Sequence, residues 1–179
     1  GIGNRVLLLL DGRPAITPES GGALWNLVPL AAIERIEVIK GAYSSLYGSS
    51  AMGGIVNVIT RTPDTASHSD LNLHYGAYGP APAYTGYKRY NDFFGAEFIT
   101  SRKLNKWSYL FNFAGKSNDG NREQSSFNLY NGYGKFKFDF SPNRSLQISA
   151  MYNDIFNDTP ATWLSTTEAY SVADYRKDD

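Results

Sequence analysis

The chain has 179 residues, and its 17 Lys plus Arg balance its 17 Asp plus Glu, which excludes the positive field typical of nucleic-acid-binding proteins. It contains no cysteine, which excludes disulfides, thiolate catalysis and Cys-ligated zinc. The 13 Tyr, 10 Phe, 3 Trp and 17 Gly favour strands and turns. No apolar run is long enough for a transmembrane helix, whereas a membrane-spanning strand needs only ~9–11 alternating residues.

Residues 1–63 combine short apolar runs with turn residues, and they predict a small α+β body. Val6 to Leu10 is expected to be a strand buried on both faces and ended by the turn pair Asp11-Gly12. After a loop, a short helical piece is expected to begin at Pro29. Two further strands follow, at 35–40 and 55–60. The apolar residues expected to form the core are Ile36, Val38, Ile55, Val56 and Val58.

Residues 70–179 alternate apolar and polar residues with a period of two, and this pattern recurs in five segments. One face of each predicted strand is apolar, and the opposite face is polar or charged. That pattern is typical of a transmembrane β-barrel with lipid outside and water inside. The apolar positions are Leu71, Leu73, Tyr75 and Ala77; Phe94, Ala96 and Phe98; Trp107, Tyr109, Phe111 and Phe113; Phe136, Phe138 and Phe140; and Leu146, Ile148, Ala150 and Tyr152.

The predicted connections alternate between short and long. Short turns at 103–105 and 141–144 separate long polar loops at 79–90, 116–126 and from 157 onward. Bacterial outer-membrane barrels have short periplasmic turns and long extracellular loops. A soluble β-sandwich shares the alternation but has no reason to lengthen every second loop. The barrel is therefore favoured, and a soluble β-rich binding module stays open as an alternative.

Three motifs occur in order in the first part of the chain. They are Val6-Leu-Leu-Leu-Leu-Asp-Gly-Arg-Pro14, Val28-Pro-Leu-Ala-Ala-Ile-Glu-Arg-Ile-Glu-Val-Ile-Lys-Gly41 and Ser45-Leu-Tyr-Gly-Ser-Ser-Ala-Met-Gly-Gly-Ile-Val-Asn-Val-Ile-Thr60. Together they closely resemble the plug of TonB-dependent outer-membrane receptors, and the resemblance covers residues 5–63 almost continuously. Alternating aromatic strands directly after such a plug make the resemblance specific.

The resemblance implies a plug inside a 22-stranded barrel in the outer membrane of a Gram-negative bacterium. Such receptors bind a scarce nutrient, typically a siderophore, haem or cobalamin, and import it with energy supplied by TonB. The implied division is the C-terminal part of a plug at 1–63, a linker at 64–69 and the first five to six antiparallel barrel strands at 70–179. A sixth strand is expected to start near Ala169 to Arg176.

Two groups of residues are candidates for functional contacts. Four charged residues could join the plug to the polar barrel wall, where wet ion pairs would hold it yet remain separable; they are Arg35, Glu37, Lys40 and Arg61. A solvated strand face is the competing interpretation for these four. The outward plug loops and the first long loop could bind the ligand through aromatic and polar groups; the candidates are Glu19, Trp25, Tyr43, Ser44, Ser45, Tyr84 and Tyr87.

Several chemistries are not supported by the sequence. His68 and His74 lack the spacing of a metal-ligand pair on one helix face, and the oxygen-rich loops at 118–123 and 153–158 lack that of a calcium loop. The glycines at 41, 48, 53 and 54 are interpreted as conformational, because no phosphate-binding context surrounds them. No nucleophile motif is present. We therefore expect no enzyme activity, no metal and no cofactor.

The chain is expected to be the product of a truncated receptor gene or a segment cut from a longer receptor, because a full barrel needs several times this length. Gly1 leads directly into a strand-like run, so the first part of the plug and the segment that contacts TonB are expected to precede it. The partners implied are TonB, outer-membrane lipid and a nutrient ligand, with no nucleic acid. A passive or glycan-specific channel is the alternative function, although such a channel needs no plug segment.

Overall fold

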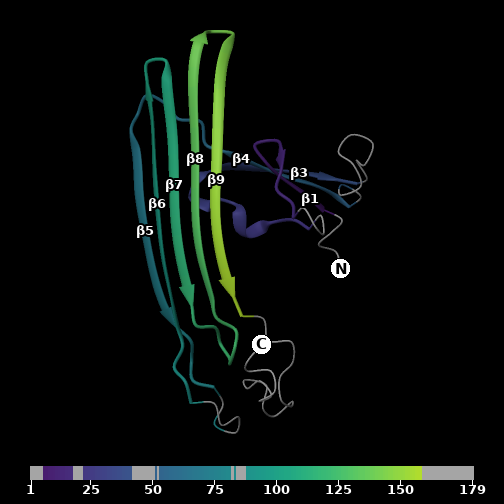
Figure 1. Cartoon of the computed structure of the whole chain (residues 1–179), viewed down its shortest axis with the longest axis vertical. Helices are drawn as coiled ribbons and strands as arrows, with labels where there is room; N and C mark the ends of the chain where they lie inside the picture. Colours follow the sequence, from purple (N-terminus) through teal and green to yellow (C-terminus); the bar gives the residue numbers. More distant parts are fainter. Residues whose placement is uncertain are drawn as a thin grey trace. The chain divides into compact units, whose positions relative to one another are not determined.

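The computed structural model describes residues 6–17, 22–41, 51, 53–81, 83 and 88–158. Its first motif is a small four-stranded sheet in the order β2-β1-β4-β3 (Figure 1). These strands are β1 (Val6–Leu10), β2 (Arg13–Pro14), β3 (Ile33–Lys40) and β4 (Gly54–Thr60). β1 pairs in parallel with β4, while β1–β2 and β3–β4 are antiparallel.

The turn between β1 and β2 confirms the Asp11-Gly12 prediction. Asp11 has φ 49° and Gly12 has φ 77°, so both central residues adopt the left-handed conformation that a tight hairpin turn requires. Leu9 then pairs with Pro14, and Leu10 pairs with Arg13. This geometry places the Asp11 side chain at the end of β1, where the functional site begins.

The core of the small sheet lies around β1 and β4. Leu7, Leu9, Ala51 and Ile55 form one buried cluster, against which Ile16 packs. The prediction that β1 is buried on both faces is confirmed for residues 7–10. The expected core was partly wrong, because Ile36 and Val38 are 54% and 61% exposed. They lie on β3, the last strand of the sheet, and β3 is exposed along almost its whole length.

The helical content of this region includes two 3-10 turns. They are η2 (Trp25–Leu27) and η3 (Leu30–Ala32). Pro29 precedes η3 as its N-cap residue, so the short helical piece expected after Pro29 is present as a single 3-10 turn that ends at Ala32. Extended backbone resumes at Ile33, where β3 begins, because Ile33 and the following residues pair with β4.

The second motif is a five-stranded sheet, here called the long sheet, in the order β5-β6-β7-β8-β9 (Figure 1). Its strands are β5 (His68–Ala77), β6 (Asp92–Leu104), β7 (Trp107–Asn118), β8 (Phe127–Ser141) and β9 (Arg144–Asn157). Each contains one of the five predicted segments, and two-residue gaps join β6 to β7 and β8 to β9. The predicted sixth strand, near Ala169 to Arg176, lies outside the described residues.

The two faces of the long sheet have the polarity expected from the alternating pattern. The apolar positions are exposed, and among them are Leu73, Phe113, Phe140 and Tyr152. The alternate positions are buried and include Ile99, Leu110 and Leu129 together with polar groups, namely Ser101, Ser108, Asn112, Asn131 and Lys135. A whole sheet face of exposed large apolar side chains is unusual for a water-soluble protein. It is typical of strands that face lipid on one side.

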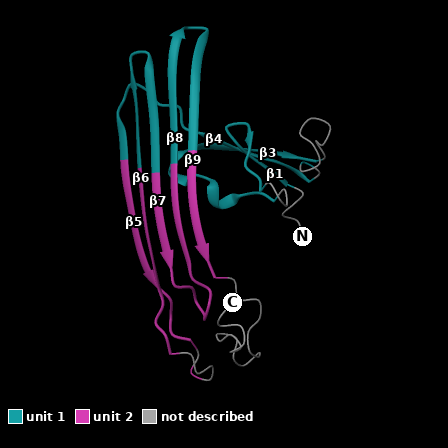
Figure 2. Ribbon diagram, viewed as in Figure 1, with its two compact units in different colours: residues 1–69, 99–112, 133–150 teal, residues 70–98, 113–132, 151–179 magenta. Residues whose placement is uncertain are grey.

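The chain divides into two compact units (Figure 2). The first comprises residues 1–69, 99–112 and 133–150, and so holds the small sheet and the short-turn ends of β6 to β9. The second comprises residues 70–98, 113–132 and 151–179, and its described part holds the remaining portions of the strands with the connections at their other ends. Within the described ranges, no helix has the length and apolar character needed to cross a membrane.

Candidate functional site

The Asp11 carboxylate is the centre of a buried polar cluster within the first unit. Its Oδ2 atom lies 2.9 Å from Lys135 Nζ and accepts hydrogen bonds from Tyr133 Oη at 2.9 Å and Thr60 Oγ1 at 2.7 Å. Its Oδ1 atom accepts a bond from the Thr60 backbone N–H at 2.8 Å. Asp11 directly follows β1 and Thr60 ends β4, whereas Tyr133 and Lys135 belong to β8. The cluster therefore joins the two sheets.

Burial makes the interactions of this cluster costly to break. The side chains of Lys135 and Asp11 are only 8% and 16% exposed, and Thr60 is fully buried. Burial alone would raise the pKa of Asp11, but the Thr60 and Lys135 hydrogen bonds and the Lys135 charge outweigh it and lower that pKa. Asp11 is therefore ionised at neutral pH. Removing one partner of such a buried pair costs about 3–5 kcal/mol, because the other charge stays buried without compensation.

A second contact joins the same hairpin to the long sheet. Arg13 Nη1 donates a hydrogen bond to Ser149 Oγ on β9 at 2.8 Å. This contact is exposed, so it contributes less to attachment of the hairpin than the Asp11 cluster does.

We name Asp11, Thr60, Tyr133 and Lys135 together the anchor cluster. None of these four residues was a candidate from the sequence, although Asp11 lies in a motif and Lys135 on the polar face of its strand.

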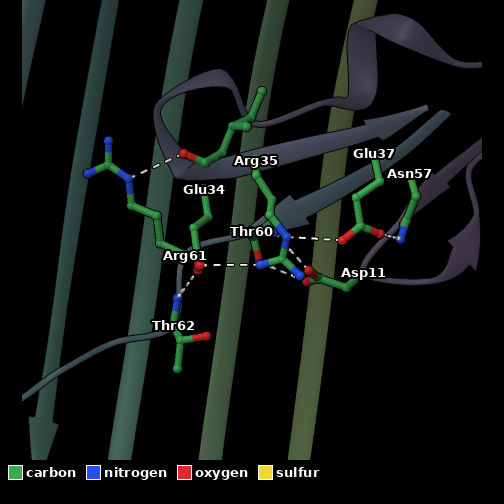
Figure 3. Close-up of polar contacts among 9 residues, drawn as sticks. Asp11, Glu34, Arg35, Glu37, Asn57, Thr60, Arg61 and Thr62 are labelled. Atoms are coloured by element: carbon green, nitrogen blue, oxygen red, sulfur yellow. Dashed lines mark hydrogen bonds and ion pairs between the residues drawn. The ribbon is translucent and has the colours of Figure 1, made fainter.

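The predicted contact residues Arg35 and Glu37 face each other along β3 (Figure 3). Arg35 Nε donates to Glu37 Oε1 at 3.0 Å, and Arg35 Nη1 donates to Glu34 Oε1 at 3.3 Å. Glu37 also accepts a bond from Asn57 Nδ2 at 3.2 Å. Lys40 is exposed at the end of β3, opposite Gly54. These contacts lie within the small sheet, and contact of Arg35, Glu37 and Lys40 with a barrel wall stays a prediction.

Arg61, the fourth predicted contact residue, lies where the chain leaves the small sheet. Its Nε donates to the Ile33 carbonyl at 3.4 Å, and its Nη1 donates to His68 Nε2 at 3.1 Å. His68 is the first residue of β5, so Arg61 connects the small sheet to the start of the long sheet. Next to it, the Thr62 N–H donates to Glu34 Oε2 at 3.2 Å (Figure 3).

Of the predicted ligand-contacting residues, only Trp25 lies in the described part of the chain. It begins η2, and it is 51% exposed. An exposed tryptophan on a short turn can stack on a ligand without rearrangement of the core. The other six candidates lie outside the described residues; they are Glu19, Tyr43, Ser44, Ser45, Tyr84 and Tyr87.

The second unit holds a polar cavity of about 460 Å³ at the long-loop ends of its strands. Asn91 Nδ2 donates to the Gly120 carbonyl at 2.7 Å, and Ser126 Oγ donates to Asp158 Oδ2 at 2.5 Å. These bonds tie the connection between β7 and β8 to its neighbours on both sides. Sequence reasoning missed the cavity, whose charged lining residues are Arg89, Asp119, Arg122, Glu123 and Asp158. Such a lining can hydrogen-bond a polar ligand.

The chain is similar in sequence to several known outer-membrane proteins. Residues 1–55 match the family model of the TonB-dependent receptor plug domain. A vitamin B12 transporter, BtuB of Vibrio vulnificus, is 43% identical over 74 residues, which are 41% of this chain and 12% of the transporter. An iron-regulated outer membrane virulence protein of Vibrio cholerae is 50% identical over 66 residues, covering 32% of this chain and 10% of that protein.

Solved structures extend the similarity beyond the small sheet. The siderophore receptor PirA from Pseudomonas aeruginosa superposes with a TM-score of 0.68 over 86% of this chain and 26% of the receptor. At 23% sequence identity, this likeness concerns the fold alone. The chain spans about an eighth of the length of the vitamin B12 transporter. The structural similarity to PirA covers 86% of this chain, whereas the sequence similarity to the vitamin B12 transporter covers 41% of it.

Proposed function

We propose, because this chain is part of a TonB-dependent receptor, that the whole receptor imports a scarce nutrient across the outer membrane of a Gram-negative bacterium with energy supplied by TonB. One observation carries the proposal. A segment that matches the receptor plug is followed by strands whose apolar face is exposed and whose polar face is buried. The polar face carries Lys135 and Tyr133, which hold the small sheet through Asp11.

The substrate proposed is an iron–siderophore complex, haem or cobalamin. Sequence relatives include a vitamin B12 transporter and a ferric enterobactin receptor, so the matched segment occurs with more than one of these ligands. Trp25 would contribute an aromatic contact on the plug. The six other ligand candidates named from the sequence remain part of the proposal.

The proposed architecture is a plug at residues 1–63, a linker at 64–69 and the first strands of a 22-stranded barrel at 70–179. In it, the β1–β2 hairpin of the plug is attached to β8 through the anchor cluster. The anchor cluster is buried, whereas Arg35, Glu37 and Lys40 on β3 are exposed. Exposed ion pairs contribute at most about 1 kcal/mol each. We therefore propose that the β1–β2 hairpin stays attached to β8 during transport.

An uptake assay on the full-length receptor tests this function. Cells that express it would be given radiolabelled cobalamin, haem or ferric siderophores one at a time, with and without TonB. Uptake of one of these ligands that is lost without TonB is expected. Undiminished uptake without TonB would instead identify a passive channel. Binding without uptake in either strain would refute the import role.

A further inference from the structure

The polar cavity of the second unit is built from three separate connections at the long-loop ends of the strands. Residues 89–91 precede β6, residues 119–126 join β7 to β8, and Asp158 directly follows β9. Its volume of about 460 Å³ falls within the range of small-molecule pockets, roughly 300–1,000 Å³. The cavity therefore has the size of a ligand-binding site.

The connection between β7 and β8 is held in one shape by its own contacts. Ser125 Oγ accepts a hydrogen bond from the Arg122 N–H at 3.2 Å and donates one to the Arg122 carbonyl at 2.8 Å. Gly120 has φ 78°, and a Cβ there would lie 2.1 Å from Ser125 Oγ. Gln124 also has a positive φ, of 49°. For a residue other than glycine this backbone conformation costs energy, and such strain is typical of functional segments.

The neighbouring connections fix this segment from both sides. The Asp119 N–H donates to the Asp92 carbonyl at 2.9 Å, and the Asp158 N–H donates to the Ser126 carbonyl at 2.9 Å. The side-chain hydrogen bonds of Asn91 and Ser126 support the same two junctions. The cavity walls are thus formed before a ligand binds, so binding costs little ordering of the loops.

The charges that line the cavity decide which ligands fit it. The guanidinium groups of Arg89 and Arg122 line it together with the carboxylates of Asp119, Glu123 and Asp158. A cation would therefore meet like charge at the arginines, and an anion would meet it at the carboxylates. In the part of the chain that the structure describes, no group of three acidic or histidine side chains could hold a metal ion. An apolar ligand would remove water from these charges without replacing its hydrogen bonds. The lining therefore favours a neutral ligand rich in hydrogen-bonding groups.

Hydroxyl groups suit such a lining better than amides do. A hydroxyl donates one hydrogen bond and accepts others at the same oxygen, so neighbouring hydroxyls can bind a carboxylate and a guanidinium together. Tyr90 also lines the cavity, and 84% of its surface is exposed. Its ring offers a flat apolar face on which the C–H groups of a sugar ring can pack.

We infer that this cavity binds a neutral carbohydrate, with Tyr90 against a sugar ring, Arg89 donating to its hydroxyls and the carboxylates accepting from them. The inference needs only the geometry of the second unit. It goes beyond the proposed import role, in which the nutrient is an iron–siderophore complex, haem or cobalamin. Two sources offer the same hydroxyls, namely a free oligosaccharide and a neutral glycan chain of lipopolysaccharide.

The test measures binding of the full-length receptor in detergent to immobilised probes by biolayer interferometry. Hexasaccharides of glucose, galactose and mannose are the neutral probes, and hexamers of sialic acid and glucosamine are the charged ones. At least one neutral probe is expected to bind more tightly than either charged probe. Tyr90→Ala and Arg89→Gln should each weaken that binding about tenfold, because one removes the packing ring and the other a charged donor.

Three further variants are controls, and heat-modifiable gel migration checks that every variant is folded. Tyr90→Phe keeps the ring and should bind as the wild type does. Tyr152→Ala and Arg144→Gln remove an exposed tyrosine and an exposed arginine that do not line the cavity, so they should leave the affinity unchanged. If Tyr90→Ala does not fold, Arg89→Gln and Tyr90→Phe decide the result.

Several outcomes would overturn the inference. Absence of binding to all the neutral hexasaccharides would refute it, as would equal binding of a charged hexamer or of a neutral glycine–serine peptide. Unchanged affinity in folded Tyr90→Ala and Arg89→Gln, or an equal loss in the Tyr152 and Arg144 controls, would place the sugar outside this cavity.

The source of the carbohydrate is identified with the receptor in nanodiscs that contain lipopolysaccharide with or without its outer glycan chain. If only the complete form blocks the neutral probe, the cavity binds that chain. Equal probe binding in both nanodiscs assigns the cavity to a free oligosaccharide. The uptake assay is independent: lost uptake with intact sugar binding would refute the import role alone.

Discussion

Asp11 carries most of the polar contact between the two sheets. One carboxylate receives a backbone N–H, two hydroxyls and an ammonium group, which satisfies both of its oxygens. A charge buried in this way is stable only while these partners are present. The consequence is that small changes at Asp11 or Lys135 should have large effects, whereas changes at the exposed charges of β3 should have small ones.

The substitution Asp11→Asn should weaken attachment of the small sheet by about 3–5 kcal/mol, because Lys135 keeps a buried charge without its carboxylate. Asn also tolerates the left-handed backbone of position 11, so the turn is preserved. The measurement is the urea dependence of proteolysis in the small sheet of the full-length receptor in detergent.

Glu37→Gln provides the control for this substitution, since it alters only an exposed ion pair. It should change the free energy of attachment of the small sheet by less than about 1 kcal/mol. The double variant Asp11→Leu/Lys135→Met should be less destabilised than Asp11→Asn, because neither charge remains buried. Equal urea midpoints for Asp11→Asn and Glu37→Gln would contradict the anchoring role.

Gly76 provides a test of side-chain packing in the second unit. The Phe93 ring lies over it, so a Cβ added at Gly76 would lie 2.1 Å from Phe93 Cζ. Gly76→Ala must displace that ring from its edge-to-face contact with Tyr78, and should destabilise the receptor by about 1–3 kcal/mol. Gly79→Ala is the control, because its Cβ would meet no atom within 4 Å. Loss of heat-modifiable gel migration at the same temperature in both variants would contradict this interpretation.

At the scale of elements, attachment of the β1–β2 hairpin to β8 should depend on pH in one direction. The pKa of Asp11 is lowered in the folded protein, so its ionised form contributes stability that is fully present above the ordinary value of 3.8. That contribution is lost as the pH falls through the lowered folded value. Attachment should therefore be constant from neutral pH to about pH 4 and weaken below it.

Trp25 fluorescence in a variant without the other tryptophans, followed from pH 7 to pH 2, would measure this dependence. The Asp11→Asn variant should show no corresponding transition, since it has no carboxylate at this position. A transition centred well above the ordinary pKa of Asp would mean that another group controls attachment.

The strands were predictable from the sequence because each is specified by its own residues. Alternation at Trp107 to Phe113 identifies β7 without reference to any other segment, and the Asp11-Gly12 turn is equally local. Exposure of Ile36 and Val38 was not predictable in this way. Their alternation resembles that of a half-buried strand, and only the order of strands shows that β3 lies at the end of the sheet.

The anchor cluster was not predictable because its partners are distant in sequence. Asp11 meets Tyr133 across 122 positions, and nothing in either local pattern specifies that pairing. The charged residues Arg35, Glu37, Lys40 and Arg61 were prominent because they lie in the family motif. Arg61 does contact the first residue of β5, but the hydrogen bonds of Arg35 and Glu37 are with residues of the small sheet.

At the scale of the whole receptor, a chemical crosslink tests whether the β1–β2 hairpin stays attached to the long sheet during transport. This segment contains no cysteine, so in a full-length receptor whose other cysteines are replaced by serine, Arg13→Cys/Ser149→Cys can be bridged selectively by a short bismaleimide. Because the buried anchor cluster is harder to separate than exposed pairs, uptake should persist when these positions are bridged. The measurement is TonB-dependent uptake before and after crosslinking.

The unbridged double variant is the control for lost side chains, because both substitutions remove the Arg13–Ser149 hydrogen bond. If uptake stops only after bridging, the β1–β2 hairpin must leave the long sheet during transport. The proposed fixed role of the anchor cluster would then be wrong.

The contact between Arg13 and Ser149 also constrains the order of events during biogenesis. It joins residues 136 positions apart, and four strands of the long sheet lie between them in the sequence. Contacts that close such long loops form late, since their entropy cost comes before any stabilising interaction. The β1–β2 hairpin is made first by the ribosome, yet it cannot complete its contacts until β9 exists. The plug can therefore complete its attachment only after β9 has been synthesised.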